Sequence, residues 1–216
     1  MFSRRGLRVI AWLIPFLVLA VIAYGGWLIP LDREISGSLK DTVGRLSILN
    51  LVWVVGGVPV TGLVVLATAL ARRQGRWLAL FLLGTFVEVL TKHWISTPMP
   101  SAVPEAHWLS WLEARTNPSP SWTLATLRHL LGIHPQQGAG HPFLLGSFFS
   151  GHVFRITFVV GMLSRYQPLV TPMSALVASV LVVALGGHWA IDAAGAFCIA
   201  SVLLAFTSES RRTSRR

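Results

Sequence analysis

Six apolar windows constrain this chain more than any other feature of its sequence, because each is about as long as a helix that crosses a lipid bilayer. They fall at about 9–30, 48–71, 77–95, 148–165, 168–186 and 188–207. Only 12% of the 216 residues are charged, about half the share in an average soluble domain. We therefore predict an all-α fold, with residues 1–216 forming one polytopic membrane domain built as a six-helix transmembrane bundle.

The positive charge of the chain lies mainly at the boundaries of these windows. There are 18 Lys and Arg residues against 8 Asp and Glu residues. With the N-terminus in the cytoplasm, eleven of these cations lie inside and six outside, although the outer connections are far longer. This asymmetry predicts a plasma-membrane protein with both termini cytoplasmic. Outside the windows no stripe of Lys and Arg alternates with aromatic residues, so we expect the bilayer and no nucleic acid as a partner.

Two outer segments are more than simple turns. In residues 31–47, apolar side chains such as Leu31, Ile35 and Leu39 recur at helical intervals, which predicts an amphipathic helix on the membrane surface. Residues 96–147 form a long outer loop between the third and fourth spans. A connection of that length usually has a function or a structure of its own.

Ionisable residues inside the windows indicate where the functional site lies, since such residues are costly in a bilayer and mark function. They are Glu88, Lys92, Arg155, His188 and Asp192, with His152 close to the start of the fourth span. In the orientation above, nearly all of them fall in the outer third of the membrane. This common level predicts a single pocket that faces outward.

The spacing of these residues suggests particular pairs. His188 and Asp192 are four residues apart, so on one helix they share a face. A carboxylate bound to one imidazole nitrogen leaves the other nitrogen available as a nucleophile or base. A polar pair that merely joins two helices is the alternative. Glu88 likewise precedes Lys92 by four residues, so Lys92 could serve a structural ion pair.

A group that recognises phosphate is expected near His152. Ser150 and Gly151 precede it, and small residues permit close approach of a ligand to the backbone. If a helix starts there, its first N–H groups favour an anion. Two histidines, a carboxylate, a lysine and a helix start suit a phosphate monoester or diphosphate. We find no metal-ligand spacing such as His-Glu-x-x-His and expect neither a metal nor another cofactor.

Three short segments resemble the signature motifs of the type 2 phosphatidic acid phosphatase superfamily. Those motifs read Lys, six residues, Arg-Pro; then Pro-Ser-Gly-His; then Ser-Arg, five residues, His, three residues, Asp. The corresponding segments here are Lys92–Pro100, Phe149–His152 and Leu181–Asp192. Their order and the long outer loop between the first two also agree with that superfamily, so the resemblance covers nearly the whole chain.

The resemblance implies a metal-independent lipid phosphatase. In it His188 would be the nucleophile that forms a phosphohistidine, Asp192 would orient it, and His152 would be the general acid. Lys92, Ser150 and the Gly151 amide would hold phosphate oxygens. The substrate would be a lipid or isoprenoid phosphate at the outer membrane face. A phospho-headgroup transferase of the same superfamily and an inactive member that binds or transports lipids are the alternatives.

Both motif arginines are missing from their positions. Met99 stands at the first and Val182 at the second, and Phe149 replaces the proline of the middle motif. Arg155 lies three residues after His152 and would share its helix face. We predict that Arg155 partly replaces the missing guanidinium groups in holding phosphate. The alternative is that Arg155 pairs with Glu88 or Asp192, or extends to the interface, without touching substrate.

Overall fold

The structure is a computed structural model that describes residues 4–42, 51–95, 147–165 and 167–207. Within these ranges the chain forms eight helices and no strand, which confirms the all-α prediction for the described part. The helices are α1 (Arg4–Gly25), α2 (Ile29–Thr42), α3 (Leu51–Val55), α4 (Val58–Ala71), α5 (Arg76–Trp94), α8 (Gly151–Leu163), α9 (Val170–Ala184) and α10 (Ala190–Ala205). The predicted outer loop lies outside the described residues, except for Ser147.

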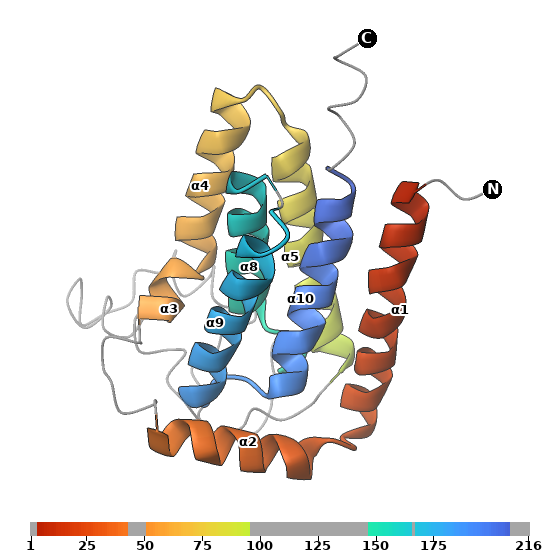
Figure 1. Ribbon diagram of the computed structural model, residues 1–216, viewed down its shortest axis with the longest axis vertical. Coiled ribbons are helices and arrows are strands. Elements are labelled where there is room, and N and C mark those ends of the chain that lie inside the picture. Colours follow the sequence, from red (N-terminus) through yellow and green to blue (C-terminus); the bar gives the residue numbers. More distant parts are fainter. Residues whose placement is uncertain (1–3, 43–50, 96–146, 166, 208–216) are drawn as a thin grey trace, which may run out of the picture.

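Six helices run side by side, namely α1, α4, α5, α8, α9 and α10, and α2 lies across one end of the bundle (Figure 1). The start of α1, the end of α10 and the turn between α4 and α5 lie at the opposite end. That turn contains Arg72 and Arg73, and Arg165 lies in the turn between α8 and α9. The bundle therefore has an arginine-bearing end and an end that is crossed by α2.

Two predicted spans have different bounds in the structure. The first helix occupies Arg4–Gly25 rather than 9–30, because Gly26 adopts a positive φ of 65°, the conformation in which helices commonly end. The second window, 48–71, is not one helix. It is divided into α3 and α4 at Gly56 and Gly57, just before Pro59. Glycine and proline in sequence are strong helix-ending signals, and they override the continuous apolar pattern here.

Span length separates α1 from the other apolar helices. Within the described residues one helix, over Arg5–Gly25, is long and apolar enough to cross a bilayer by length and composition. Four further apolar helices, α4, α8, α9 and α10, contain 10–17 residues. The six-span topology therefore stays a prediction. Many large apolar side chains nevertheless point out of the bundle, among them Leu17, Leu63, Leu70, Leu82 and Leu176, each more than half exposed.

The first part of the predicted amphipathic helix is present as α2, while residues 43–47 lie outside the described residues. The inward face of α2 differs from the prediction. Asp32 and Ser36 are buried, and Ile35 and Leu39 are half-buried. Leu31, which we expected on the apolar stripe, is 51% exposed. Because α2 packs against α9 and α10, the side chain on its inward face is that of Asp32 and not that of Leu31.

The core of the bundle contains a row of aromatic rings, which we call the aromatic column. Successive ring centroids lie 5.9–6.4 Å apart. The rings are those of Phe149, Phe154, Phe81, Phe158 and Trp77. The column begins just before α8 and ends at the first turn of α5. Aromatic pairs at these distances add to the stability gained from burial, so the column links α5 to α8 along the bundle.

Candidate functional site

The residues that we predicted for the site lie together at the end of the bundle that α2 crosses. Four structural parts contribute them, namely α5, the residue before α8, the first two turns of α8, and the segment around the start of α10. Within this site two groups of side chains can be distinguished. We call His152, His188 and Asp192 the histidine cluster, and Glu88, Lys92 and Arg155 the charge cluster.

In the histidine cluster, His188 and Asp192 are paired, but not on one helix as we expected. The helix α10 begins at Ala190, and Trp189 is its N-cap residue, so His188 lies in the preceding turn. Its Nδ1 is nevertheless 3.4 Å from Asp192 Oδ2. The same oxygen accepts the backbone N–H of Trp189 at 2.9 Å. Asp192 thus caps α10 and orients His188 with a single carboxylate, and both residues are fully buried.

The second imidazole of the cluster faces the first. The ring centroids of His152 and His188 are 6.5 Å apart. His152 also meets the edge of the Trp53 ring, with centroids 4.7 Å apart, and its side chain hydrogen-bonds to the Trp53 backbone. A Cβ added at Gly187 would overlap the Trp53 ring. Trp53 is therefore wedged between His152 and the turn that carries His188, a contact that the sequence analysis missed.

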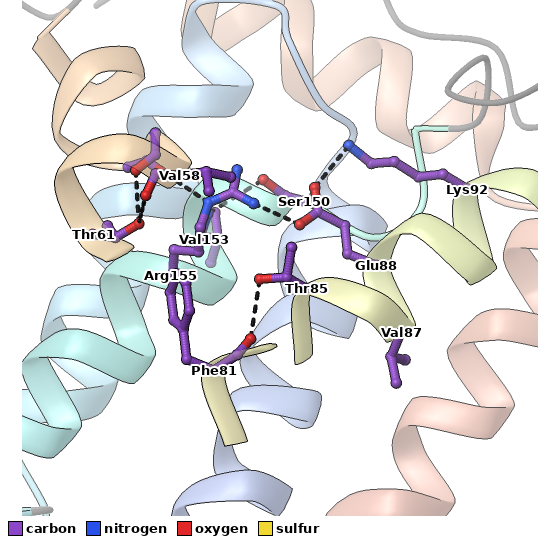
Figure 2. A network of polar contacts seen from close by, with 12 residues as sticks. Val58, Thr61, Phe81, Thr85, Val87, Glu88, Lys92, Ser150, Val153 and Arg155 are labelled. Atoms are coloured by element: carbon purple, nitrogen blue, oxygen red, sulfur yellow. Dashed lines mark hydrogen bonds and ion pairs between the residues drawn. The ribbon is translucent and has the colours of Figure 1, made fainter. Parts of the chain in front are cut away.

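The charge cluster centres on the Glu88 carboxylate (Figure 2). Glu88 Oε1 is 3.1 Å from Lys92 Nζ, and Oε2 is 2.6 Å from Arg155 Nη1. All three side chains are less than a tenth exposed. Arg155 Nε also donates to the carbonyl oxygen of Gly56 at 2.7 Å, which lies where the second window breaks. In the structure Arg155 therefore adopts the ion pair with Glu88 that we weighed as the alternative to phosphate binding.

Ser150 and Gly151 form the start of α8, as predicted. Ser150 is the N-cap residue, and its side-chain oxygen accepts the N–H of Val153 at 3.4 Å. Its own N–H donates to the carbonyl oxygen of Asp192 at 3.1 Å, which ties α8 to α10. Gly151 lies against Glu88, since a Cβ added there would overlap the carboxylate oxygens. The start of α8 thus connects the histidine cluster to the charge cluster.

Of the two positions that lack the motif arginine, the structure describes one. Met99 lies outside the described residues. Val182 is fully buried in α9, and its carbonyl oxygen accepts the N–H of Gly187 at 3.0 Å. The side chain that replaces the second arginine is therefore a core residue, one turn before the segment that carries His188. Phe149 is also fully buried and begins the aromatic column.

A third carboxylate lies beside the histidine cluster. Asp32 of α2 is 3% exposed and hydrogen-bonds to the backbone of Ala190 and Ile191 at the start of α10. Burial and the nearby Asp192 carboxylate raise the pKa of Asp32 from 3.8 to about 6. Asp32 was not among the predicted site residues, because the helical pattern of its segment indicated only a membrane-surface role.

This arrangement has the components of acid–base and nucleophilic chemistry on an anion. Two imidazoles face each other, one of them bound to a carboxylate, and two buried cations lie beside a helix start. An oriented imidazole can act as a nucleophile, and cations with backbone N–H groups stabilise a phosphoryl group. No group of three or more His, Cys, Asp or Glu side chains in the described ranges is arranged to hold a metal ion.

Comparison with known proteins identifies a solved structure with a similar fold. No protein-family model matches the chain, and no curated protein matches its sequence. Its structure is similar to the crystal structure of a transmembrane PAP2-type phosphatidylglycerolphosphate phosphatase from Bacillus subtilis. The match has a TM-score of 0.58 at 16% sequence identity and covers 97% of this chain and 98% of that chain. The resemblance stated from the motifs is thus confirmed at the level of the fold.

Proposed function

We propose that this chain is a membrane phosphatase of the type 2 phosphatidic acid phosphatase superfamily, acting on a lipid or isoprenoid phosphate or diphosphate. The observation that carries the proposal is the pairing of His188 with Asp192, opposite His152, on a fold shared with a lipid phosphatase. His152 and His188 are more than 30 positions apart in the sequence, and the fold brings them together here. Fold alone does not set activity, so the side-chain pairing is the stronger support.

The proposed reaction has two steps. His188 Nε2 attacks phosphorus while Asp192 holds Nδ1, and a bond forms between nitrogen and phosphorus. The bond from phosphorus to the leaving oxygen breaks, and that oxygen takes a proton from His152. In the second step His152 accepts a proton from water, which attacks phosphorus and releases phosphate from His188. No metal or other cofactor takes part in this scheme.

Phosphate binding is assigned to the charge cluster and the start of α8. Lys92 and Arg155 supply two positive charges, and the Ser150 side chain and the Gly151 backbone N–H at the start of α8 suit an anion. Arg155 stands in for the missing guanidinium groups in this proposal, because its planar fork suits phosphate geometry. Glu88 engages both cations in the structure.

The membrane placement is also part of the proposal. Apolar side chains cover the outside of the bundle, and the arginine-bearing turn between α4 and α5 lies at the end opposite the site (Figure 1). The positive-inside rule assigns such an end to the cytoplasm. We therefore propose six spans in the cell membrane, with both termini inside and the site open to the outer leaflet.

Phosphate release tests the activity directly. Purified protein in detergent and EDTA is given a panel of phosphatidic acid, phosphatidylglycerolphosphate and isoprenoid mono- and diphosphates. We expect release from at least one substrate and a loss of about ten-thousandfold or more in the His188→Ala variant. Full activity in that variant would exclude His188 as the nucleophile. An acid-stable phosphoenzyme would also be incompatible with a phosphohistidine.

Thiol labelling of intact cells tests the orientation. Cysteine is introduced at Ser119 in the outer loop and, in a separate protein, at Ser208 after α10. The buried Cys198 serves as the internal background in both. We expect an impermeant reagent to label the first variant and not the second. The reverse pattern would move the site to the inner leaflet.

One observation favours a second candidate, an inactive member that binds lipids. Both cations of the charge cluster are already paired with Glu88, so they are not available to substrate in this state. An inactive protein would release no phosphate from any member of the panel. It would still bind those lipids, which a vesicle co-flotation assay with the same panel would detect.

A further inference from the structure

The Glu88 carboxylate occupies a position suited to a bound anion. It lies between two buried cations, with Arg155 Nη1 at 2.6 Å from one oxygen and Lys92 Nζ at 3.1 Å from the other. Both cations reach it from different helices, α8 and α5, as Figure 2 shows. Two cations converging on the two oxygens of one acid resemble the way proteins hold carboxylate or phosphate ligands.

The carboxylate also touches the backbone at the start of α8. A Cβ added at Gly151 would overlap both oxygens and the carboxyl carbon of Glu88. Only glycine leaves room for an acid this close to the chain. The first N–H groups of a helix lack partners within the helix and favour a negative charge. The Glu88 carboxylate therefore occupies the position that the proposed function assigns to the substrate phosphate.

We propose that Glu88 is an internal competitor of the substrate, and that its carboxylate must leave the charge cluster before a phosphoryl group can bind there. The inference rests on the proposed function for the identity of the ligand. It concerns binding rather than turnover, however, and can be tested without a substrate. Glu88 then acts as a specificity-determining residue, because a ligand must compete with it for Lys92 and Arg155.

Space and charge both make the two occupants exclusive. The Glu88 oxygens already contact Gly151 so closely that no phosphate oxygen fits between them. Two cations and one carboxylate carry a net charge of +1, and a phosphate dianion beside them would bring the group to −1. Like charges forced together at a binding site repel each other and weaken binding. A phosphoryl group that binds must therefore displace Glu88 from at least one of its two cations.

A purely structural role for Glu88 makes a different prediction. In that case the carboxylate only neutralises two buried cations, and removing its charge lowers stability without creating an anion site. Under the competitor role, removing the charge frees Lys92 and Arg155 from their ion pairs with the carboxylate, and the affinity for phosphate rises. The affinity for free orthophosphate therefore separates the two roles.

The experiment measures orthophosphate binding by calorimetry on the purified full-length protein in detergent, comparing wild type with Glu88→Gln. We expect the variant to bind orthophosphate about tenfold to a hundredfold more tightly. The matched control is Glu34→Gln, which makes the same change on the exposed face of α2, and we expect it to bind as wild type does. Equal affinity in wild type and Glu88→Gln, or no binding by either, would overturn the inference.

A second variant keeps the test informative if Glu88→Gln does not fold. Glu88→Asp keeps the negative charge but withdraws it from Gly151 by one methylene, about 1.5 Å. We expect it to retain the fold and to bind orthophosphate more tightly than wild type by about threefold, because its contact with the two cations is weaker. A wild-type affinity in Glu88→Asp would overturn the inference.

The outcomes distinguish the inference from the proposed function. If no lipid phosphate is hydrolysed but Glu88→Gln binds orthophosphate more tightly, the competitor role stands and the phosphatase proposal fails. If wild type hydrolyses a lipid phosphate and the two proteins bind orthophosphate equally, the phosphatase proposal stands and the competitor role fails.

Discussion

The histidine cluster and the charge cluster lie at the same end of the bundle, but they are held together in different ways. In the histidine cluster, His188 and Asp192 are four residues apart, and backbone groups from the same turn complete the pair. In the charge cluster, Arg155 reaches a carboxylate 67 positions away and a carbonyl oxygen 99 positions away. The His188–Asp192 pair is local and matches a known motif, whereas the contacts of Arg155 depend on how α3, α5 and α8 pack.

This difference shows which part of a site can change while the rest is retained. A nucleophile and its orienting acid need one geometry, and a short turn provides it. Positive charge near a phosphate can come from several directions, so an arginine lost from one element can be replaced from another. The proposed replacement, Arg155, lies on α8 and is paired with an acid on α5. The predictions below test whether the two clusters differ in this way.

The largest expected effect concerns the local pair. Replacing Asp192 by Asn keeps the shape but removes the charge that fixes the tautomer of His188, so we expect phosphate release to fall by about a hundredfold or more. Asp41→Asn, an exposed change on α2, is the matched control and should keep wild-type activity. Rates are measured in the phosphate-release assay at several pH values. A normal rate in Asp192→Asn would show that the two clusters do not differ as described.

The next effect concerns the long-range pair. Arg155→Met removes one of the two cations that bind the buried Glu88 carboxylate and the donor to the Gly56 carbonyl oxygen. We expect a loss of about 3 kcal/mol in the free energy of unfolding, as for other broken buried ion pairs. Thermal unfolding in detergent gives the size of the loss. Arg73→Met, at an exposed turn position, is the control.

A double-mutant cycle sharpens this result. If Arg155 and Glu88 form one unit, the variant carrying both Arg155→Met and Glu88→Gln should be more stable than the sum of the single losses implies, by about 1 kcal/mol or more. Strictly additive losses would mean that the two side chains do not stabilise each other, and the charge cluster would not be a unit.

A smaller effect is expected from the contact between α3 and the histidine cluster. Trp53→Leu removes the ring that lies edge-on to His152 but keeps the backbone group to which His152 hydrogen-bonds. We expect kcat/KM to fall about tenfold because the general acid is less firmly positioned. Trp94→Leu, which changes an exposed tryptophan of α5, should leave kcat/KM unchanged. A loss of stability with unchanged kcat/KM would assign Trp53 to packing alone.

The smallest effect concerns Asp32. Its pKa in the folded protein is raised from 3.8 to about 6, so its contribution to stability is fully present below pH 3.8 and is lost as the pH rises through about 6. Wild type should therefore lose stability relative to Asp32→Asn between pH 4.5 and pH 7.5. The melting temperatures of both proteins at these two pH values measure the change. Asp41→Asn on the same helix should show no such trend, and a constant difference for Asp32→Asn would contradict the prediction.

The sequence predicted the all-α class and the gathering of the site residues, because apolar windows and short motifs are local patterns. It also predicted that Lys92 and Glu88 could pair, since i,i+4 spacing on a helix fixes that distance. It did not predict that His188 precedes α10, because the sixth apolar window already begins at residue 188. Composition marks where a helix is favourable, while the cap formed by Asp192 decides where this one begins.

Contacts between distant elements could not be predicted from the sequence. The break at Gly56 and Gly57 is visible as a pair of glycines, but nothing in the sequence indicates that the freed carbonyl oxygen accepts a hydrogen bond from Arg155. Asp32 was missed for a related reason. The helical pattern of 31–47 predicts an apolar stripe, but the packing of α2 on α9 and α10 determines which face of the helix is buried.

The aromatic column has a consequence for how the membrane stays sealed. The proposed hydrolysis needs water at the reaction centre, yet a hydrated path through the bundle would let protons and ions cross. From Phe149 to Trp77 the interior beyond the site is filled by rings in contact, and Phe154 and Phe158 are fully buried. Rings offer no hydrogen-bonding chain along which a proton could travel. We therefore expect that the protein does not conduct protons or ions and that water reaches the site from one side of the bilayer alone.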